Sequence, residues 1–137
     1  MRYPITLTPS DGKLVVAVDD VPGVNTFGDD EEDALLQAAD ALETMLDHYF
    51  ENKLPVPLPS KVRRGRPSIN IPVSLAAKVL LHNELLTQQV RPSELARRLN
   101  LPRQEMTRLL DPHIVTKIDS IDEAMKALGK NIELQVA

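Results

Sequence analysis

The chain has 137 residues, 42% of them hydrophobic and 26% charged, which suffices for one ordinary domain or two small ones with an apolar core. The absence of cysteine excludes disulfides, cysteine zinc sites and thiol nucleophiles. No apolar run approaches the roughly 18 residues of a membrane span, and the N-terminus lacks the apolar stretch of a signal peptide, so we expect a cytoplasmic protein.

Charge is distributed unevenly on the two sides of the proline-rich run at residues 55–59. Residues 1–60 contain three basic and twelve acidic side chains, a net charge of −9, whereas residues 61–137 contain thirteen basic and eight acidic ones, a net charge of +5. An acidic module suits a cationic protein partner and a basic one suits nucleic acid, although charge can also segregate by chance in a short chain. We therefore divide the chain into a first domain (1–60), a basic linker with a short strand (61–72) and a second domain (73–137).

The first domain is expected to begin with a β-meander. Apolar and polar residues alternate over residues 2–8, which predicts a strand with one buried face, and residues 14–18 predict a second. Asp11-Gly12 between them is a strong signal for a tight hairpin turn. Residues 24–27 can add a third short strand.

A long helix should follow the meander, capped by Asp29 or Asp30. Apolar residues recur at spacings of three and four from Ala34 to Phe50, which predicts a helix with one face covering the sheet. The acidic residues at 30–33 would occupy the first turn, where the helix dipole favours them. A domain of about 60 residues, such as residues 1–60, buries only about 60% of the surface that its unfolded chain exposes, so we expect a partner or oligomerisation to stabilise it.

The most informative stretch of the second domain is residues 92–110. Two short helices, opening at Pro92 and Pro102, flank the turn at residues 99–101, where Asn100 stands at a position requiring positive φ. This pattern predicts a helix-turn-helix, and an unrelated helical hairpin is the alternative.

Four further elements surround this motif. We expect a brief extended segment at residues 69–71, a helix over 74–86, a helix over 116–128 and a terminal strand over 131–136. The terminal strand could pair with residues 69–71 or with a second subunit.

Basic and polar side chains make the second domain a candidate for DNA binding. The outward face of the second motif helix carries side chains that can read base edges, namely Arg103, Gln104, Thr107 and Arg108. Arg64 and Arg66 lie in an Arg-Gly-Arg-Pro segment that resembles the core of an AT-hook, which enters the minor groove. A solvated basic linker is the alternative, and both versions attract phosphate.

No residue pattern predicts catalysis, a metal site or a cofactor. His48, His82 and His113 lack the spacing of metal ligands and suit surface or packing positions. Asp19 and Asp20 follow a predicted strand and are better explained as facing solvent or a partner. Together with Asp29 they are our candidates for contacting a protein partner.

Taken in order, several segments resemble the HicB antitoxins of HicAB toxin–antitoxin systems, in the branch with a helix-turn-helix of the Xre/Cro type. The resemblance covers nearly the whole chain. It is carried by residues 1–4, 49–52, 54–60, 79–81, 94–98, 104–109 and 127–130.

This resemblance implies an α+β protein without enzymatic activity. Its N-terminal domain would have a truncated ribonuclease H-like fold and bind a HicA-type toxin, a small basic mRNA-cleaving ribonuclease, covering the toxin's RNA surface and catalytic histidine. Its C-terminal domain would bind the operator of its own operon as a dimer, with a tetramer also open.

Two rival functions remain open on the sequence alone. A ribonuclease H-type enzyme needs carboxylates for two metal ions, and the first predicted strand, which supplies a central ligand in that family, has none. A stand-alone repressor whose N-terminal domain senses a small molecule shares every DNA-binding feature. The neighbouring gene separates these alternatives, because only an antitoxin should stand beside a gene for a basic toxin.

Overall fold

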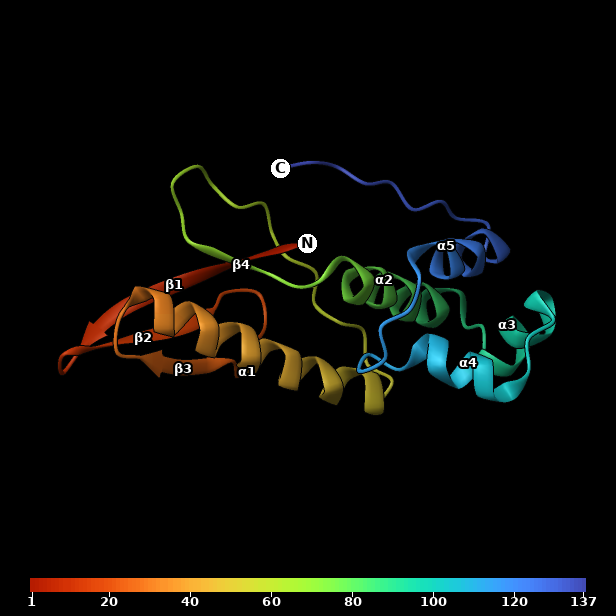
Figure 1. Ribbon diagram of the computed structural model, residues 1–137, viewed down its shortest axis with the longest axis horizontal. Helices are drawn as coiled ribbons and strands as arrows, with labels where there is room; N and C mark the ends of the chain where they lie inside the picture. Colours follow the sequence, from red (N-terminus) through yellow and green to blue (C-terminus); the bar gives the residue numbers. More distant parts are fainter. The chain divides into compact units, whose positions relative to one another are not determined.

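The computed structural model describes all residues from Met1 to Ala137 and has a mixed α+β architecture with four strands and five helices (Figure 1). The chain forms two compact units: Met1–Glu51 with Pro57–Pro72, and Asn52–Val56 with Val73–Ala137. None of the five helices combines the length and apolar character needed to cross a bilayer.

A four-stranded antiparallel sheet forms the centre of the first unit. Its spatial order is β3-β2-β1-β4, and the strands are β1 (Arg2–Ser10), β2 (Lys13–Val18), β3 (Asn25–Gly28) and β4 (Ser68–Asn70). Asp11 and Gly12 join β1 to β2 with φ of 49° and 77°, the positive values of a tight hairpin turn. The predicted meander and its Asp-Gly turn are therefore confirmed.

Helix α1 (Glu31–Glu51) covers one face of this sheet and buries Ala34, Ala38, Leu42 and Leu46. The Asp30 carboxylate accepts a hydrogen bond from the Asp33 amide at 2.8 Å, which caps the helix as expected. The first turn of α1 packs directly on Gly28, where an added Cβ would lie 2.2 Å from the Ala34 nitrogen. Glycine at this position is what lets the helix approach the sheet.

Residues 57–72 belong to the first unit, whereas the sequence suggested a linker after Ser60. Strand β4 pairs with β1 in the register Tyr3↔Ile69 and so becomes an edge of the sheet. The Tyr3 hydroxyl donates to the Pro57 carbonyl at 2.8 Å, and the amide and hydroxyl of Ser60 both donate to the Asp20 carboxylate. These contacts attach the proline-rich segment to the sheet.

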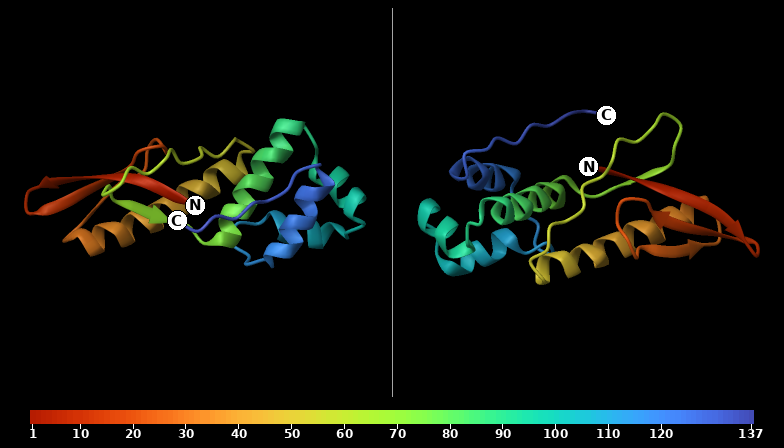
Figure 2. Two further views of the ribbon diagram at one scale, coloured as in Figure 1. Left: turned by 90° about the horizontal axis from the view of Figure 1, so that it is seen from above. Right: turned by 180° about the vertical axis from the view of Figure 1, so that it is seen from behind.

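The second unit is helical, with α2 (Val73–Gln88), α3 (Pro92–Leu99), α4 (Arg103–Leu110) and α5 (Ile118–Ala127) (Figure 2). Its core joins all four helices through buried side chains, which include Leu81, Leu95, Met106 and Ile121. Residues Asn52–Val56 are attached to α2, because His82 donates to the Leu54 carbonyl and the Asn83 amide exchanges two hydrogen bonds with the backbone of Val56.

The terminal strand predicted over residues 131–136 is wrong. Gly129, at φ 77°, ends the turn after α5, and residues 131–137 form no strand. Leu134 and Val136 are 74% and 97% exposed. The reason is the lack of a partner edge, since the second unit contains no other strand and residues 68–70 pair with β1 instead.

Candidate nucleic-acid interface and protein-binding surface

Helices α3 and α4 are joined by a tight turn centred on Asn100. The backbone there is left-handed, with φ 54° and ψ 44°, as the sequence predicted. The Asn100 amide donates to the Arg97 carbonyl and the Leu101 amide to the Ala96 carbonyl, at 3.2 and 2.9 Å. These bonds satisfy carbonyls at the end of α3 and redirect the chain into α4.

The four candidate base-reading residues lie together on the exposed side of α4. Arg103, Gln104, Thr107 and Arg108 are all exposed, whereas Met106 and Leu109 are buried on the other side. The Thr107 hydroxyl donates to the Arg103 carbonyl at 3.0 Å, so it is turned toward the helix backbone. This face thus presents two guanidinium groups and one amide to solvent, together with the hydroxyl oxygen of Thr107 as an acceptor.

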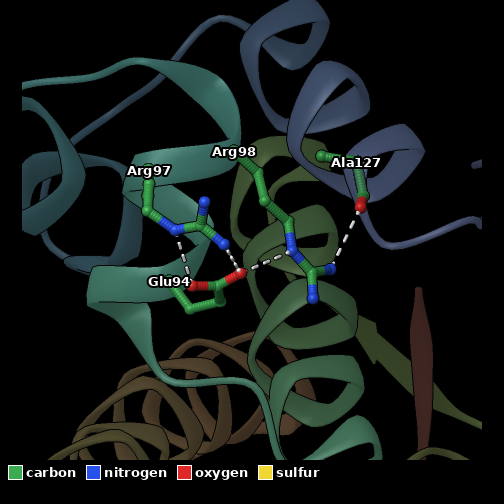
Figure 3. A network of polar contacts seen from close by, with 4 residues as sticks. All are labelled: Glu94, Arg97, Arg98 and Ala127. Carbon is green, nitrogen blue, oxygen red and sulfur yellow. Dashed lines mark hydrogen bonds and ion pairs between the residues drawn. The ribbon is translucent and has the colours of Figure 1, made fainter.

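The arginines of α3 are engaged within the second unit (Figure 3). Arg97 and Arg98 both donate to the Glu94 carboxylate, and Arg98 also reaches the Ala127 carbonyl at the end of α5, at 3.4 Å. Hydrogen bonding from Arg97 lowers the pKa of Glu94, which holds this carboxylate in its charged form. Basic charge on α3 is therefore partly neutralised, in contrast to that on α4.

Arg64 and Arg66 lie in the first unit and not in the unit that contains α4. Both are exposed in a turn in which the Arg66 amide donates to the Arg63 carbonyl at 3.1 Å and Gly65 has φ 79°. The segment just before β4 is therefore folded into a turn, whereas an AT-hook binds in extended form.

The three candidate partner-contacting aspartates have different environments. Asp19 is exposed and accepts a hydrogen bond from the Thr6 hydroxyl at 2.7 Å, and Asp29 is exposed and pairs with Lys13 at 2.9 Å. Asp20 is half-buried, and one of its carboxylate oxygens accepts both hydrogen bonds from Ser60. Asp19 and Asp29 are thus accessible, while Asp20 stabilises the fold.

Sequence reasoning missed an acidic strip along the solvent side of α1. At 100° per residue, six carboxylates share this side, opposite the buried alanines and leucines: Glu32, Asp33, Asp40, Glu43, Asp47 and Glu51. Leu36, which is 66% exposed, lies among them. The available signal was the spacing of three and four among the acidic residues at 40, 43, 47 and 51, which alternates with the apolar periodicity of the same helix.

The sheet of the first unit also has an exposed face. Val15 and Phe27 are cross-strand partners whose side chains point away from α1, and Phe27 is 57% exposed. The Lys13 ammonium lies 5.1 Å from the centre of the Phe27 ring. An apolar centre with Asp19 and Asp29 at the ends of its strands is a surface suited to a protein partner.

The two structural units have net charges that differ from those of residues 1–60 and 61–137. The first unit contains six basic and twelve acidic residues, a net charge of −6, and the second contains ten basic and eight acidic, a net charge of +2. Lys61, Arg63, Arg64 and Arg66 belong to the first unit, which reduces the contrast seen when the chain is cut at residue 60. The signs remain opposite.

The structure places no group of three or more His, Asp or Glu side chains close enough to hold a metal ion. The three histidines lie apart on different elements: His48 is exposed on α1, His82 is buried on α2, and His113 follows α4. Burial lowers the pKa of His82, whose ring donates to the Leu54 carbonyl at 2.7 Å. Its observed contact is structural.

The chain is similar to known antitoxins of bacterial toxin–antitoxin systems. The family model of HicB-like antitoxins of bacterial toxin–antitoxin systems matches residues 2–80. The chain belongs to this family. Antitoxin HicB of Escherichia coli K12 is 45% identical over 135 residues, which cover 98% of both chains. Antitoxin HicB 1 of Photorhabdus laumondii is 39% identical and covers 99% of this chain and 87% of its own, and Antitoxin HicB of Pseudomonas fluorescens Pf0-1 is 33% identical over 136 residues.

In this HicB-like antitoxin, the match to the family model runs from β1 into α2 and so includes the whole sheet. Helices α3, α4 and α5 lie beyond it, but the similarity to the three relatives extends over both units. Family membership therefore rests on the first unit and on the full length together.

Proposed function

We propose that this antitoxin neutralises a HicA-type toxin by direct binding through its first unit. Support comes from the family, from the net charge of −6 and from the two exposed surfaces described above, the acidic strip of α1 and the Val15–Phe27 face of the sheet. Acidic surface speeds encounter with a cationic toxin, while apolar surface provides the contact area. The toxin contacts include Asp19 and Asp29, and the antitoxin itself performs no chemistry.

The second unit represses the antitoxin's own operon in the bacterial cytoplasm by binding operator DNA. The observation that carries this proposal is the exposed face of α4, with Arg103, Gln104 and Arg108 directed to solvent after a tight turn. Arginine pairs with guanine and glutamine with adenine in the major groove. The α3–α4 pair then acts as a helix-turn-helix, with α4 as its recognition helix.

A homodimer presents two copies of α4 to one operator. Residues 131–136, in which Leu134 and Val136 are exposed and Ile132 is half-buried, provide a means of dimerisation, because this segment can find in a second copy the strand partner that its own unit lacks. The operator should then be an inverted repeat whose half-sites lie about 34–36 Å or a multiple apart. A tetramer would join two such dimers.

The decisive experiment co-expresses the full chain with the tagged product of the adjacent gene. We expect co-purification, and we expect the complex to protect mRNA from cleavage by that product. A chain that binds its own promoter but fails to co-purify would instead be a stand-alone repressor. Titration of the full chain against promoter and scrambled DNA at two salt concentrations tests the second unit, and equal affinity for both sequences would contradict operator recognition.

A further inference from the structure

Lys78 on α2 is a buried lysine with an unusual set of partners. Its side chain is in the core of the second unit, with only 1% of its surface exposed. The ammonium nitrogen donates to the Arg108 carbonyl at 3.1 Å, to the Asp111 carbonyl at 2.7 Å and to the Ile114 carbonyl. All three N–H groups are thus used, and every acceptor is a backbone oxygen at or just beyond the end of α4.

Each of these carbonyls also accepts one local hydrogen bond: Arg108 from the Asp111 amide, Asp111 from the Ile114 amide and Ile114 from the Thr116 hydroxyl, at 3.3, 3.2 and 3.4 Å. The last carbonyls of a helix have no partner within the helix, and α4 ends at Asp111 in an extended conformation, with φ −82° and ψ 116°, in contrast to the left-handed cap of α3. A positive charge at this end also complements the helix dipole. Lys78 therefore ties the end of α4 and the turn after it to α2, in addition to the local hydrogen bonds of that turn.

We propose that Lys78 is a positioning residue for DNA recognition, fixing the end of α4 and the turn after it so that the exposed face of α4 meets the groove at one defined angle. This inference rests on the proposed role of α4 as the recognition helix. It concerns a residue that never contacts DNA. It predicts that sequence preference depends on an ammonium group inside the fold.

The chemistry of the site requires an amine. Burial lowers the pKa of Lys78, and the negative charge of the neighbouring Asp111 offsets part of this shift. An apolar side chain of the same length would avoid the burial of a charge, but it would remove the three hydrogen bonds that join these carbonyls to α2. The hydrogen bonds to the end of α4 thus explain why a charged lysine occupies this buried position.

The lack of cysteine permits a chemical test in the full chain. Lys78→Cys introduces a single thiol, which is alkylated in denaturant before refolding. With 2-bromoethylamine, the thiolate displaces bromide and forms a carbon–sulfur bond, giving a lysine analogue with sulfur in place of the γ-carbon. With 1-bromopropane, the same displacement gives a side chain of equal length without the amine. Lys126→Cys, at an exposed lysine of α5, receives both treatments as the matched control.

The aminoethylated Lys78→Cys chain should bind operator DNA with nearly the affinity of the unsubstituted chain, whereas the propylated chain should bind it about tenfold more weakly, with a smaller change on scrambled DNA. Toxin capture should be equal in both. Amide hydrogen exchange should accelerate over residues 108–117 in the propylated chain and remain unchanged in α3, which separates local release of α4 from general destabilisation. At Lys126 the two treatments should not differ in this way.

Operator affinity and preference that are equal in the two alkylated chains would overturn the proposal. If the propylated chain does not fold, the test is repeated with Lys78→Gln, which keeps two N–H donors without the charge. Unchanged operator preference in this folded variant would also overturn the proposal. Failure of the unsubstituted chain to prefer its operator would instead contradict the proposed function of α4, so the two failures are distinguishable.

Discussion

Helices α1 and α4 each have one buried apolar face, yet their exposed faces differ in charge and length. Over its 21 residues, α1 presents six carboxylates on one side, whereas α4, with eight residues, presents two arginines, a glutamine and a threonine. Packing determines only the buried face of a helix. The exposed face is free to suit a partner, and here the two faces suit partners of opposite charge.

The same contrast holds between the units that carry these helices. The first unit is built around the four-stranded sheet, and the second around an apolar core shared by its four helices. We therefore expect toxin binding and DNA binding to be separable by substitution. The predictions below test that separation, beginning with the largest expected effect.

Core substitutions should separate the two activities most clearly. Leu42→Ala in the first unit and Leu81→Ala in the second remove side chains with no exposed surface, and each should destabilise its unit by about 2–5 kcal/mol. Urea unfolding should show the change in one transition only. Leu42→Ala should weaken toxin capture and Leu81→Ala should weaken operator binding, with Leu58→Ala, at an exposed leucine outside the proposed binding surfaces, as a control. Loss of both activities in either variant would show that the units are coupled.

Alkaline pH should destabilise the first unit through Tyr3. Burial, with a contribution from Asp20, raises the pKa of Tyr3 from 10.0 to about 12. The unfolded chain then releases this proton first, so the stabilisation is complete below pH 10 and is lost as the pH rises to about 12. The expected loss is about 2–3 kcal/mol. Tyr3→Phe should lack this component of the pH dependence, and an unchanged profile would contradict the assignment.

Substitutions on α4 should change DNA sequence preference. Replacing Arg103 or Arg108 by Ala should cost about 1–3 kcal/mol for each bidentate pairing with guanine that the substitution removes, and should relax preference at one position of each half-site. Arg64→Ala and Arg66→Ala should weaken binding to all DNA sequences equally. The slope of log affinity against log salt concentration should become smaller by about one unit for each phosphate contact that is lost. Titration on matched and scrambled operators distinguishes these outcomes. Unchanged DNA sequence preference in the Ala variants of all four α4 residues would contradict the assignment of α4 as the recognition helix.

Acid should destabilise the second unit through His82. Because burial lowers the pKa of His82, the unfolded chain takes up a proton at a pH where the folded chain stays neutral. Stability should therefore fall as the pH drops below 6.5, the ordinary value for histidine. Thermal unfolding of the full chain at several pH values, compared with His82→Asn, measures this contribution. Parallel profiles for the two chains would show that another group is responsible.

The smallest effect is expected at the Lys13–Asp29 pair. Both side chains are largely exposed, so Asp29→Asn should change stability by no more than about 1 kcal/mol. Its effect on the toxin should appear as a slower association that depends on salt. Association rates at two ionic strengths, with Asp11→Asn in the hairpin turn as a matched removal of one charge, check this expectation.

Most of the helices and the hairpin could be predicted because their signals are local. The Asp11-Gly12 turn, the Asp30 cap of α1 and the left-handed Asn100 each depend on a few neighbouring residues, and all three appear as expected. The candidate residues of α4 share one exposed face for the same reason, since helical periodicity alone places them there. Their role in DNA binding stays a prediction.

Other features were decided only by contacts between residues far apart in the chain. Residues 68–70 become a sheet edge because β1 offers them hydrogen bonds, while residues 131–136, with a similar alternation, find no strand within their unit. Asp20 is engaged by Ser60, forty residues away, and Lys78 by three carbonyls at least thirty residues away. Periodicity in the sequence shows which face of an element is apolar, but a strand edge or a buried ammonium needs a partner that only the folded chain brings close.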